Sequence, residues 1–368
     1  MKYSHFYFDD DILRREQILF KHAPYFAHEL LVDNYHTLPQ EDSARMLIRN
    51  KNGIECISNT CRHRQAVMLN RSGTTANIVC PLHGWTYDLE GKLIGAPHFD
   101  PCPERHLTKF GTQTWNGLYF GRGIADLESD LNTMRLGRYF DFTGYVFHSR
   151  KEHVCNYNWK TFIEVYMDDY HVVPFHPGLG NFVDCNKLDW QFGEWYSVQS
   201  VGLSNQLKTP GTPIYKTWHK ALLDYRRGAL PDFGAIWLTI YPNVMVEWYP
   251  EVLVISTLWP EGPQRTRNIV EFYYPEEIAH FEADFVAAHQ AAYMETCDED
   301  DEIAEHMDRG RKHLYNRGYI DSGPIQNPME IGLKHFHDYY DRWIFTDQYR
   351  PKPSTRIEDP GSEGGTLD

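Results

Sequence analysis

The chain lacks the features that mark membrane, secreted and nucleic-acid-binding proteins. It contains no run of about 18 apolar residues, the length that favours a transmembrane helix. Its first residues show no positively charged segment followed by an apolar one, so we expect no signal peptide. Basic residues number 36 against 51 acidic ones, and the formal net charge of −15 argues against a nucleic-acid partner. We therefore expect a cytoplasmic protein that binds neither nucleic acid nor a membrane.

Cysteine is also too scarce and irregular for a disulfide-stabilised fold. The seven cysteines are odd in number and unevenly spaced, so they do not form a disulfide framework. Unpaired thiols are typical of a reducing compartment. The chain has no internal repeat, and its 368 residues with 42% hydrophobic content are enough for two packed domains.

The most informative motif is a pair of mixed cysteine and histidine loops. Cys61-x-His63 is followed, after sixteen residues, by Cys80-x-x-His83. Two thiolates and two imidazoles are the ligands of a Rieske [2Fe-2S] centre, in which two histidines bind one iron. Zinc is the alternative, because a Cys2His2 set also suits tetrahedral zinc. Zinc fingers, however, usually pair Cys with Cys and His with His, so the mixed loops favour the Rieske cluster.

The remaining pattern predicts an α+β chain with a small all-β domain first. Residues 9–31 and 126–137 look helical, and a long helix is expected over 276–315. Alternating residues around the turn Lys51-Asn-Gly53 predict a hairpin. Further strands are expected at 85–89, 92–94, 117–121, 244–248, 252–258 and 268–274. The predicted organisation is an N-terminal helical segment at 1–40, a cluster domain at 41–140, a catalytic domain at 141–350 and a flexible tail at 351–368.

A second group of metal ligands is predicted in the larger domain. The stretch 158–170 can form a helix that places Asp168 and His171 at i and i+3 on one face. Pro174 cannot continue a helix interior, so we expect the chain to turn there and bring His176 back to the same point. Two histidines and one carboxylate suit a mononuclear non-haem Fe(II) with open positions for O2.

The carboxylate of this site is expected from the acidic run 298–302. Within a helix, Asp300 shares its face with Ile303, Ala304, Met307, Arg311 and Leu314. Asp298 instead shares a polar face with Asp301, Glu302 and Glu305. A carboxylate on the apolar face needs a partner, because burying it unpaired is costly. Asp300 is therefore the preferred third iron ligand, with Asp301 as the alternative.

Together these motifs resemble the α subunit of Rieske non-haem iron oxygenases, the ring-hydroxylating oxygenase superfamily. The resemblance covers nearly the whole chain. Cys61-Arg-His-Arg64 and Cys80-Pro-Leu-His-Gly-Trp85 are similar to its cluster loops. Asn158-Trp-Lys160 with Asp168-x-x-His171-x4-His176 is similar to its iron helix, and Glu299-Asp300-x-x-Ile303-Ala-Glu305 to its third-ligand segment.

The resemblance implies a terminal oxygenase component with a Rieske domain and a helix-grip catalytic domain, an antiparallel sheet with a long C-terminal helix. It also implies a homotrimer in which the cluster of one subunit lies beside the mononuclear iron of the next. Asp168 matches the family's bridging carboxylate, which would contact His171 and the neighbour's residue equivalent to His83. Electrons would come from NAD(P)H through a separate reductase or ferredoxin, and O2 would be the co-substrate.

Some residues depart from the family pattern and bear on the substrate. Gln65 stands where many members have Gly, and Val165 where many have Asn. The spacing from Asn158 to His171 is one residue shorter than in naphthalene-type dioxygenases. It is more similar to quaternary-ammonium and demethylase-type monooxygenases, whose α subunits work without a β subunit.

Two oxygenase chemistries and one non-enzymatic function follow from these observations. Hydroxylation of an aromatic ring is the first interpretation. The alternative is monooxygenation or demethylation of an alkylamine, quaternary ammonium or methoxy compound. An aromatic cage for a cation could come from Trp195, Tyr196, Tyr215, Trp218, Trp237 and Trp248. A Rieske electron carrier would need only the first hundred or so residues, so the larger C-terminal part argues against it.

Overall fold

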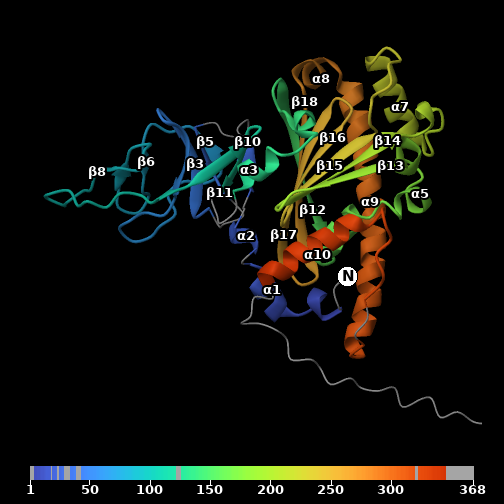
Figure 1. Ribbon diagram of the computed structural model, residues 1–368. Coiled ribbons are helices and arrows are strands. Elements are labelled where there is room, and N and C mark those ends of the chain that lie inside the picture. The colour runs from blue at the N-terminus through green and yellow to red at the C-terminus, as the bar shows by residue number, and fades with distance from the viewer. Residues whose placement is uncertain are drawn as a thin grey trace, which may run out of the picture.

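A computed structural model describes residues 4–17, 19–22, 25–28, 34–38, 43–121, 126–319 and 322–344. Figure 1 shows a smaller, mostly β part in blue and teal beside a larger part in which helices surround one broad sheet. This arrangement confirms the expected α+β fold. The predicted tail at 351–368 lies outside the described residues.

The smaller part is built from three antiparallel sheets, and its β3–β4 hairpin confirms the predicted turn. The five-stranded sheet has the order β5 (Ser72–Gly73), β2 (Tyr35–Thr37), β3 (Arg45–Asn50), β4 (Gly53–Ser58) and β9 (Lys109–Phe110). A three-stranded sheet contains β6 (Ile78–Val79), β7 (Thr86–Tyr87) and β8 (Leu93–Gly95). Another contains β1 (Tyr25–His28), β11 (Leu118–Gly121) and β10 (Thr112–Trp115). Strands β7 and β11 form within two of the segments where short strands were predicted, and β8 overlaps the third, 92–94, but ends one residue later.

The N-terminal prediction is only partly right. A 3-10 helix, η1 (Ser4–Tyr7), comes first, and helices α1 (Asp10–Glu16) and α2 (Leu19–His22) form where a helix was expected. Strand β1 then pairs with β11, and β2 pairs with β3 and β5. The predicted helix to residue 31 is therefore wrong at Tyr25–His28, and the predicted helical segment to residue 40 is also wrong at Tyr35–Thr37. Local apolar spacing could not reveal these pairings, because most of the partner strands lie far along the chain.

The connection between the two parts contains less helix than predicted. Helix α3 (Leu127–Leu131) is short, and at its start the carboxylate of Asp126 accepts a hydrogen bond from the N–H of Ser129 at 3.2 Å. A separate 3-10 helix, η4, follows at Gly137–Phe140. The predicted continuous helix over 126–137 is therefore wrong in its second half.

The larger part is centred on a seven-stranded antiparallel sheet. Its order is β12 (Tyr145–Cys155), β18 (Arg265–Pro275), β17 (Val252–Gly262), β16 (Val244–Tyr249), β15 (Ala235–Ile240), β14 (Tyr196–Leu203) and β13 (Val183–Phe192). Strands β16, β17 and β18 include the three segments that the alternation predicted. Successive side chains of a strand point to opposite faces of the sheet, so each face has its own apolar core.

Different helices cover the two faces of this sheet. Leu238 and Ile255 belong to a core shared with α1, α4 (Trp159–Tyr166) and α10 (Ile331–Ile344). Trp237 and Val254 face the other way, toward α7 (Pro213–Tyr225), α9 (Ala283–Asn316) and the short helix α6 (Leu179–Phe182). This second face carries the site described below.

The long C-terminal helix was predicted almost at its observed length. Helix α8 (Glu276–Phe281) and α9 together occupy the expected 276–315 stretch, with a break at Glu282. Helix α9 packs along α7 and reaches α4, so one long element spans the larger part (Figure 1). Within the described ranges, no helix is both long and apolar enough to cross a membrane.

Candidate functional site

The two cluster loops share one backbone hydrogen-bonding pattern. In the first, the N–H of Cys61 donates to the carbonyl of Ala66 at 2.9 Å, and the N–H of Gln65 donates to the carbonyl of Cys61 at 3.1 Å. In the second, the N–H of Cys80 donates to the carbonyl of Trp85 at 2.8 Å, and the N–H of Gly84 donates to the carbonyl of Cys80 at 3.0 Å. The two cysteines therefore occupy equivalent positions in the two loops, whereas His63 lies two residues after its cysteine and His83 lies three residues after its own.

This shared pattern explains why glycine is favoured at the position that Gln65 occupies. Gln65 has φ of 63°, and Gly84 has φ of 71° at the equivalent point of the second loop. Positive φ is accessible to glycine at little cost but is unfavourable for a residue with a Cβ. The loop keeps its conformation with Gln65, so this residue costs backbone stability without changing the shape of the loop.

The side chains of these loops divide between the domain interior and its surface. Cys61 and Cys80 are buried, whereas His83 is exposed. The rings of His63 and His83 are 4.7 Å apart between centroids, and His63 stacks on Trp85. Nδ1 of His63 is buried without a hydrogen-bond partner. An unpartnered imidazole nitrogen beside a second histidine fits a metal ligand.

The second ligand group lies beyond the end of α4, which comes earlier than predicted. Helix α4 stops at Tyr166, and Asp168 begins a turn in which its Oδ1 accepts a hydrogen bond from the N–H of Tyr170 at 2.8 Å. Pro174 lies inside the four-residue helix α5 (Val172–Phe175), so the predicted turn at this proline is wrong. The chain turns between α4 and α5 instead, and it still brings His171 and His176 together.

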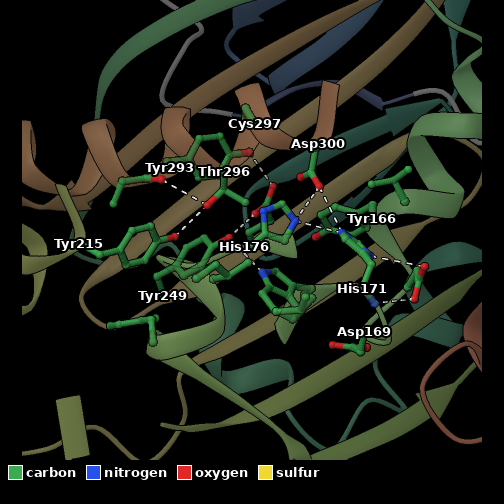
Figure 2. Close-up of a pocket in the computed structure, with 18 of the residues that line it drawn as sticks. Tyr166, Asp169, His171, His176, Tyr215, Tyr249, Tyr293, Thr296, Cys297 and Asp300 are labelled. Carbon is green, nitrogen blue, oxygen red and sulfur yellow. Dashed lines mark hydrogen bonds and ion pairs between the residues drawn. The ribbon is translucent and has the colours of Figure 1, made fainter. Parts of the chain in front are cut away.

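Three possible ligand atoms meet at one point between α4, α5 and α9 (Figure 2). Nε2 of His171 is 3.0 Å from Nε2 of His176, and Oδ1 of Asp300 is 3.4 Å and 3.0 Å from these two atoms. Ligand atoms about 2.1 Å from one metal ion, at right angles to each other, lie about 3.0 Å apart. The donor set and its spacing therefore fit a metal ion bound on one face.

A carboxylate lies at the far side of each imidazole. Oε2 of Glu299 is 2.7 Å from Nδ1 of His176, and Oδ2 of Asp168 is 3.4 Å from Nδ1 of His171. Carboxylates in this position fix the ring orientation and the tautomer of metal-binding histidines. Glu299 therefore holds His176 with Nε2 directed into the site, whereas Asp168 places a negative charge beside Nδ1 of His171 without a hydrogen bond to it.

The electrostatics of this group favour a bound cation. Burial lowers the pKa of His171, but the interactions of its imidazole with the carboxylates of Asp168 and Asp300 outweigh this effect and raise the pKa to about 10. Burial raises the pKa of Asp300, but the two neighbouring imidazoles lower it below its usual value overall. The carboxylates of Asp168, Glu299 and Asp300 surround the two imidazoles. Together they leave an excess of negative charge, which a divalent metal would balance.

Asp301 faces a different group of residues from Asp300. Its Oδ1 accepts a hydrogen bond from the hydroxyl of Tyr157 at 2.6 Å, and its Oδ2 is 2.5 Å from Nε2 of His153. The prediction that Asp301 lies on the same polar face as Asp298 is therefore incomplete, because strand β12 and the following loop cover it. Asp298 and Glu302 are exposed, as the periodicity indicated.

Buried ion pairs anchor α4 beneath this site. Nζ of Lys160 is 2.6 Å from the carboxylate of Glu16 on α1, and both side chains are buried. Glu164 pairs with Arg311 of α9 and lies 2.8 Å from Nε2 of His337 on α10. Removing one partner of a buried pair leaves an uncompensated charge, so these contacts fix α4 against α1, α9 and α10.

A cavity of about 80 Å³ opens beside His171, His176 and Asp300. Aromatic side chains form much of its wall, and three of the six predicted cage residues, Tyr215, Trp218 and Trp237, are among them. Trp195, Tyr196 and Trp248 instead pack in or against the core on the opposite face of the sheet. Among the described residues that line the cavity there is no lysine or arginine.

Sequence reasoning missed a buried carboxylate in this wall, that of Glu247. It is 2% exposed and interrupts the otherwise apolar run of strand β16. A charged residue inside a buried strand is itself a signal, because lone charges are rarely buried without a partner. Glu299 was also missed, since only the long-range fold brings it to His176.

Comparison with known families matches both parts of the chain. The family described as "Rieske [2Fe-2S] domain" matches residues 25–112, and "Ring hydroxylating alpha subunit (catalytic domain)" matches residues 142–346. The chain therefore belongs to the Rieske oxygenases, as an α subunit that combines a Rieske domain with a catalytic domain. Members of this family carry a [2Fe-2S] cluster and a mononuclear iron, use O2, and receive electrons from a reductase or ferredoxin.

Two curated relatives are similar over most of their length. A putrescine 2-hydroxylase of Ralstonia nicotianae is 58% identical over 341 residues, which cover 91% of this chain and 93% of the relative. A putrescine 2-hydroxylase of Bordetella bronchiseptica is 52% identical, covering 91% of this chain and 83% of the relative. A solved quaternary ammonium Rieske monooxygenase shares the fold, with a TM-score of 0.74, 20% identity, and coverage of 94% of this chain and 95% of that one.

Proposed function

We propose that this chain hydroxylates an aliphatic carbon of a small primary amine, of which a short diamine such as putrescine is the preferred example. The two relatives above are putrescine 2-hydroxylases at 58% and 52% identity. They favour the alternative of alkylamine monooxygenation over the aromatic ring hydroxylation that the sequence analysis put first.

The single observation that carries this proposal is the charge of the cavity. Four carboxylates line it, those of Asp168, Asp169, Glu247 and Asp300, and no described lysine or arginine does. A bound divalent metal would balance the charge of Asp168 and Asp300 beside the two histidines, which leaves Asp169 and Glu247 as the carboxylates available to a ligand. The buried imidazole of His289 adds no positive charge, because burial lowers its pKa to about 3. An anionic, aromatic-walled cavity favours a cationic ligand and disfavours an aromatic acid.

The size of the cavity supports a small substrate. At about 10–15 Å³ for each water molecule, a cavity of about 80 Å³ holds roughly five to eight waters. A four-carbon diamine has a comparable number of heavy atoms. A polycyclic aromatic substrate would require the wall to move.

We further propose which residues hold the two metal centres. Cys61, His63, Cys80 and His83 would hold the [2Fe-2S] cluster, which supplies one electron at a time. His171, His176 and Asp300 would hold the mononuclear Fe(II), which supplies O2 activation when bound. The overall reaction then balances: one oxygen atom enters a C–H bond, the other leaves as water, and NAD(P)H supplies two electrons through the reductase.

Asp168 is proposed to connect the two centres of neighbouring subunits in a homotrimer. Its carboxylate contacts Nδ1 of His171 yet stays partly exposed, with 23% of the side chain accessible. His83 is exposed on the cluster domain. An exposed carboxylate on one centre and an exposed imidazole on the other are suited to meet across a subunit boundary.

Product analysis tests the proposed function. The purified protein is combined with a surrogate reductase and NADH, and products are identified with putrescine, n-butylamine, choline, benzoate and naphthalene as substrates. We expect a hydroxylated diamine, with NADH consumption matched to product. Efficient turnover of naphthalene or benzoate without turnover of aliphatic amines would show that ring hydroxylation is the correct interpretation.

A further inference from the structure

The buried carboxylate of Glu247 lies in the cavity wall and takes no part in the metal chemistry. Strand β16 pairs Glu247 with Trp237 of β15 and with Val254 of β17. Trp237 and Val254 belong to the apolar core on the cavity side of the sheet. The register of three strands therefore directs this carboxylate into the cavity.

Two tyrosine hydroxyls hold the Glu247 carboxylate in place. Tyr293 of α9 donates to Oε1 at 2.8 Å, and Tyr249 donates to Oε2 at 2.9 Å. The indole N–H of Trp237 donates in turn to the Tyr249 hydroxyl at 3.0 Å. An ionised carboxylate has about four acceptor positions, so about two remain for a ligand.

No lysine or arginine among the described lining residues balances the charge of Glu247. Burial is the main reason why its pKa is raised to about 7, and the negative charge of Asp300 adds to this effect, although the two tyrosines lower it. Burying a carboxylate without a positive partner is costly. A protein that keeps such a group in a ligand cavity gains from it when a cationic ligand supplies the missing charge.

We propose that Glu247, held by Tyr249 and Tyr293, binds a primary ammonium group of the substrate and so fixes which carbon lies beside His171, His176 and Asp300. This inference rests on the proposed function and deepens it. Glu247 acts here as a residue that determines specificity, and it takes no part in the oxygen chemistry.

The distance between the two ends of the cavity suits this role. Tyr293 and Asp300 lie seven residues apart on α9, so they are on the same helix face about 10 Å apart along the axis. The carboxylate that Tyr293 holds therefore lies to one side of the metal-binding group. A chain of a few methylene groups can connect an ammonium at Glu247 with a carbon near that group.

The chemistry of this carboxylate also selects the type of ammonium. A primary ammonium has three N–H donors, and it can use the free acceptor positions of Glu247 in charge-assisted hydrogen bonds. A quaternary ammonium has no N–H and is larger, so it cannot make these bonds. The aromatic rings of Trp237, Tyr249 and Tyr293 can stabilise either cation, which makes the carboxylate the discriminating group.

Two variants of Glu247 distinguish an ammonium receptor from a structural hydrogen-bonded group. Glu247→Gln keeps the size of the side chain and removes the charge, whereas Glu247→Asp keeps the charge and shortens the side chain. An ammonium receptor needs the negative charge, so the Asp variant should bind putrescine more tightly than the Gln variant. A purely structural role needs a side chain long enough to reach both tyrosines. In that case the Gln variant should bind putrescine more tightly than the Asp variant.

The dissociation constant for putrescine, measured by calorimetry, is the readout for this inference. We expect Glu247→Gln to weaken binding by roughly 30- to 1000-fold, as for loss of one partner of a buried charge pair. Glu247→Asp should weaken it by about 10-fold or less, because the charge remains. Retained red-brown colour and iron content show that each variant is folded.

Glu271→Gln is the matched control. Glu271 is also buried and lies two strands away, but it pairs with Ile255 and therefore faces the opposite side of the sheet. This variant should bind putrescine with an affinity close to that of wild type. Equal weakening by the Gln and Asp variants of Glu247, a smaller effect of Gln than of Asp, or unchanged binding in both, overturns the inference.

Turnover is measured separately, so that the proposed function can fail independently. Putrescine that binds through Glu247 but is not hydroxylated contradicts the proposed function and leaves the ammonium receptor supported. Putrescine that is hydroxylated equally well by wild type and Glu247→Gln leaves the function supported and overturns the receptor. A wild-type protein that neither binds nor hydroxylates putrescine contradicts both.

Discussion

Replacing Glu247 by Gln should stabilise the protein above neutral pH while it impairs the binding of amines. The wild-type carboxyl has a pKa raised from 4.5 to about 7, mainly by burial. Below pH 4.5 it is protonated in both the folded and the unfolded chain. Between pH 4.5 and 7 the unfolded chain loses its proton first, so folding stability falls as the pH rises. Above pH 7 the fall in folding stability is complete. The Gln variant has no ionisable group at this position, so its stability does not fall in this way.

The magnitude of this effect follows from the pKa. Each tenfold change in an ionisation constant is worth about 1.4 kcal/mol, so a rise from 4.5 to about 7 corresponds to roughly 3 kcal/mol. For a domain of about 200 residues, about 1 kcal/mol shifts the unfolding temperature by about 2–4 °C. The Gln variant should therefore unfold roughly 6–12 °C higher than wild type at about pH 8, and at nearly the same temperature at pH 4.5.

The assay compares unfolding temperatures of wild type, Glu247→Gln and the control Glu271→Gln from about pH 4.5 to about pH 8 at one scan rate. Other titrating groups contribute equally to the wild type and the variant, so the difference between the two curves isolates Glu247. A difference that does not change with pH, or a Gln variant that is less stable than wild type at the alkaline end, would refute the reasoning that this carboxylate is buried at an electrostatic cost.

Three further predictions concern the metal sites and the support of α4. Asp300→Ala should keep the red-brown cluster colour but lose the mononuclear iron and turnover, whereas Asp301→Ala should keep the iron. If metal analysis gives the reverse result, the wrong carboxylate was assigned. Asp168→Asn should keep both metals and the trimer, yet slow cluster oxidation by orders of magnitude in single-turnover experiments with O2 and substrate; a wild-type rate excludes the bridging role. Arg311→Ala should lower the free energy of unfolding by roughly 3–5 kcal/mol in urea titrations, because it leaves Glu164 buried without its cation. A decrease in this free energy of less than about 1 kcal/mol would show that the pair contributes little.

The parts of the site that could be predicted are those encoded over short stretches of sequence. The proposed ligands Cys61 and His63 lie on one tight loop, and His171 and His176 are only five residues apart. Asp300 could be chosen over Asp301 from helical periodicity, because α9 is long and regular. The surroundings of Asp301 were predicted less completely, since they come from another strand and the loop after it.

The parts that could not be predicted depend on contacts between distant segments. Strand β1 looked like a helix continuation, because its partner β11 lies about ninety residues away. Glu247 faces the cavity only because three strands pair in a particular register. Glu299 approaches His176 only when α9 packs beside α5. Single-sequence patterns do not contain these registers, although a charged residue within a buried strand does mark Glu247 as unusual.

The most direct test of the central claim is turnover of putrescine under 18O2 by the wild-type protein with a surrogate reductase and NADH. Mass spectrometry of the product shows whether a C–H bond has been hydroxylated and where the oxygen comes from. We predict a monohydroxylated diamine that carries one 18O atom, with one NADH consumed for each product. Absence of any hydroxylated amine while an aromatic compound is dihydroxylated would contradict the claim.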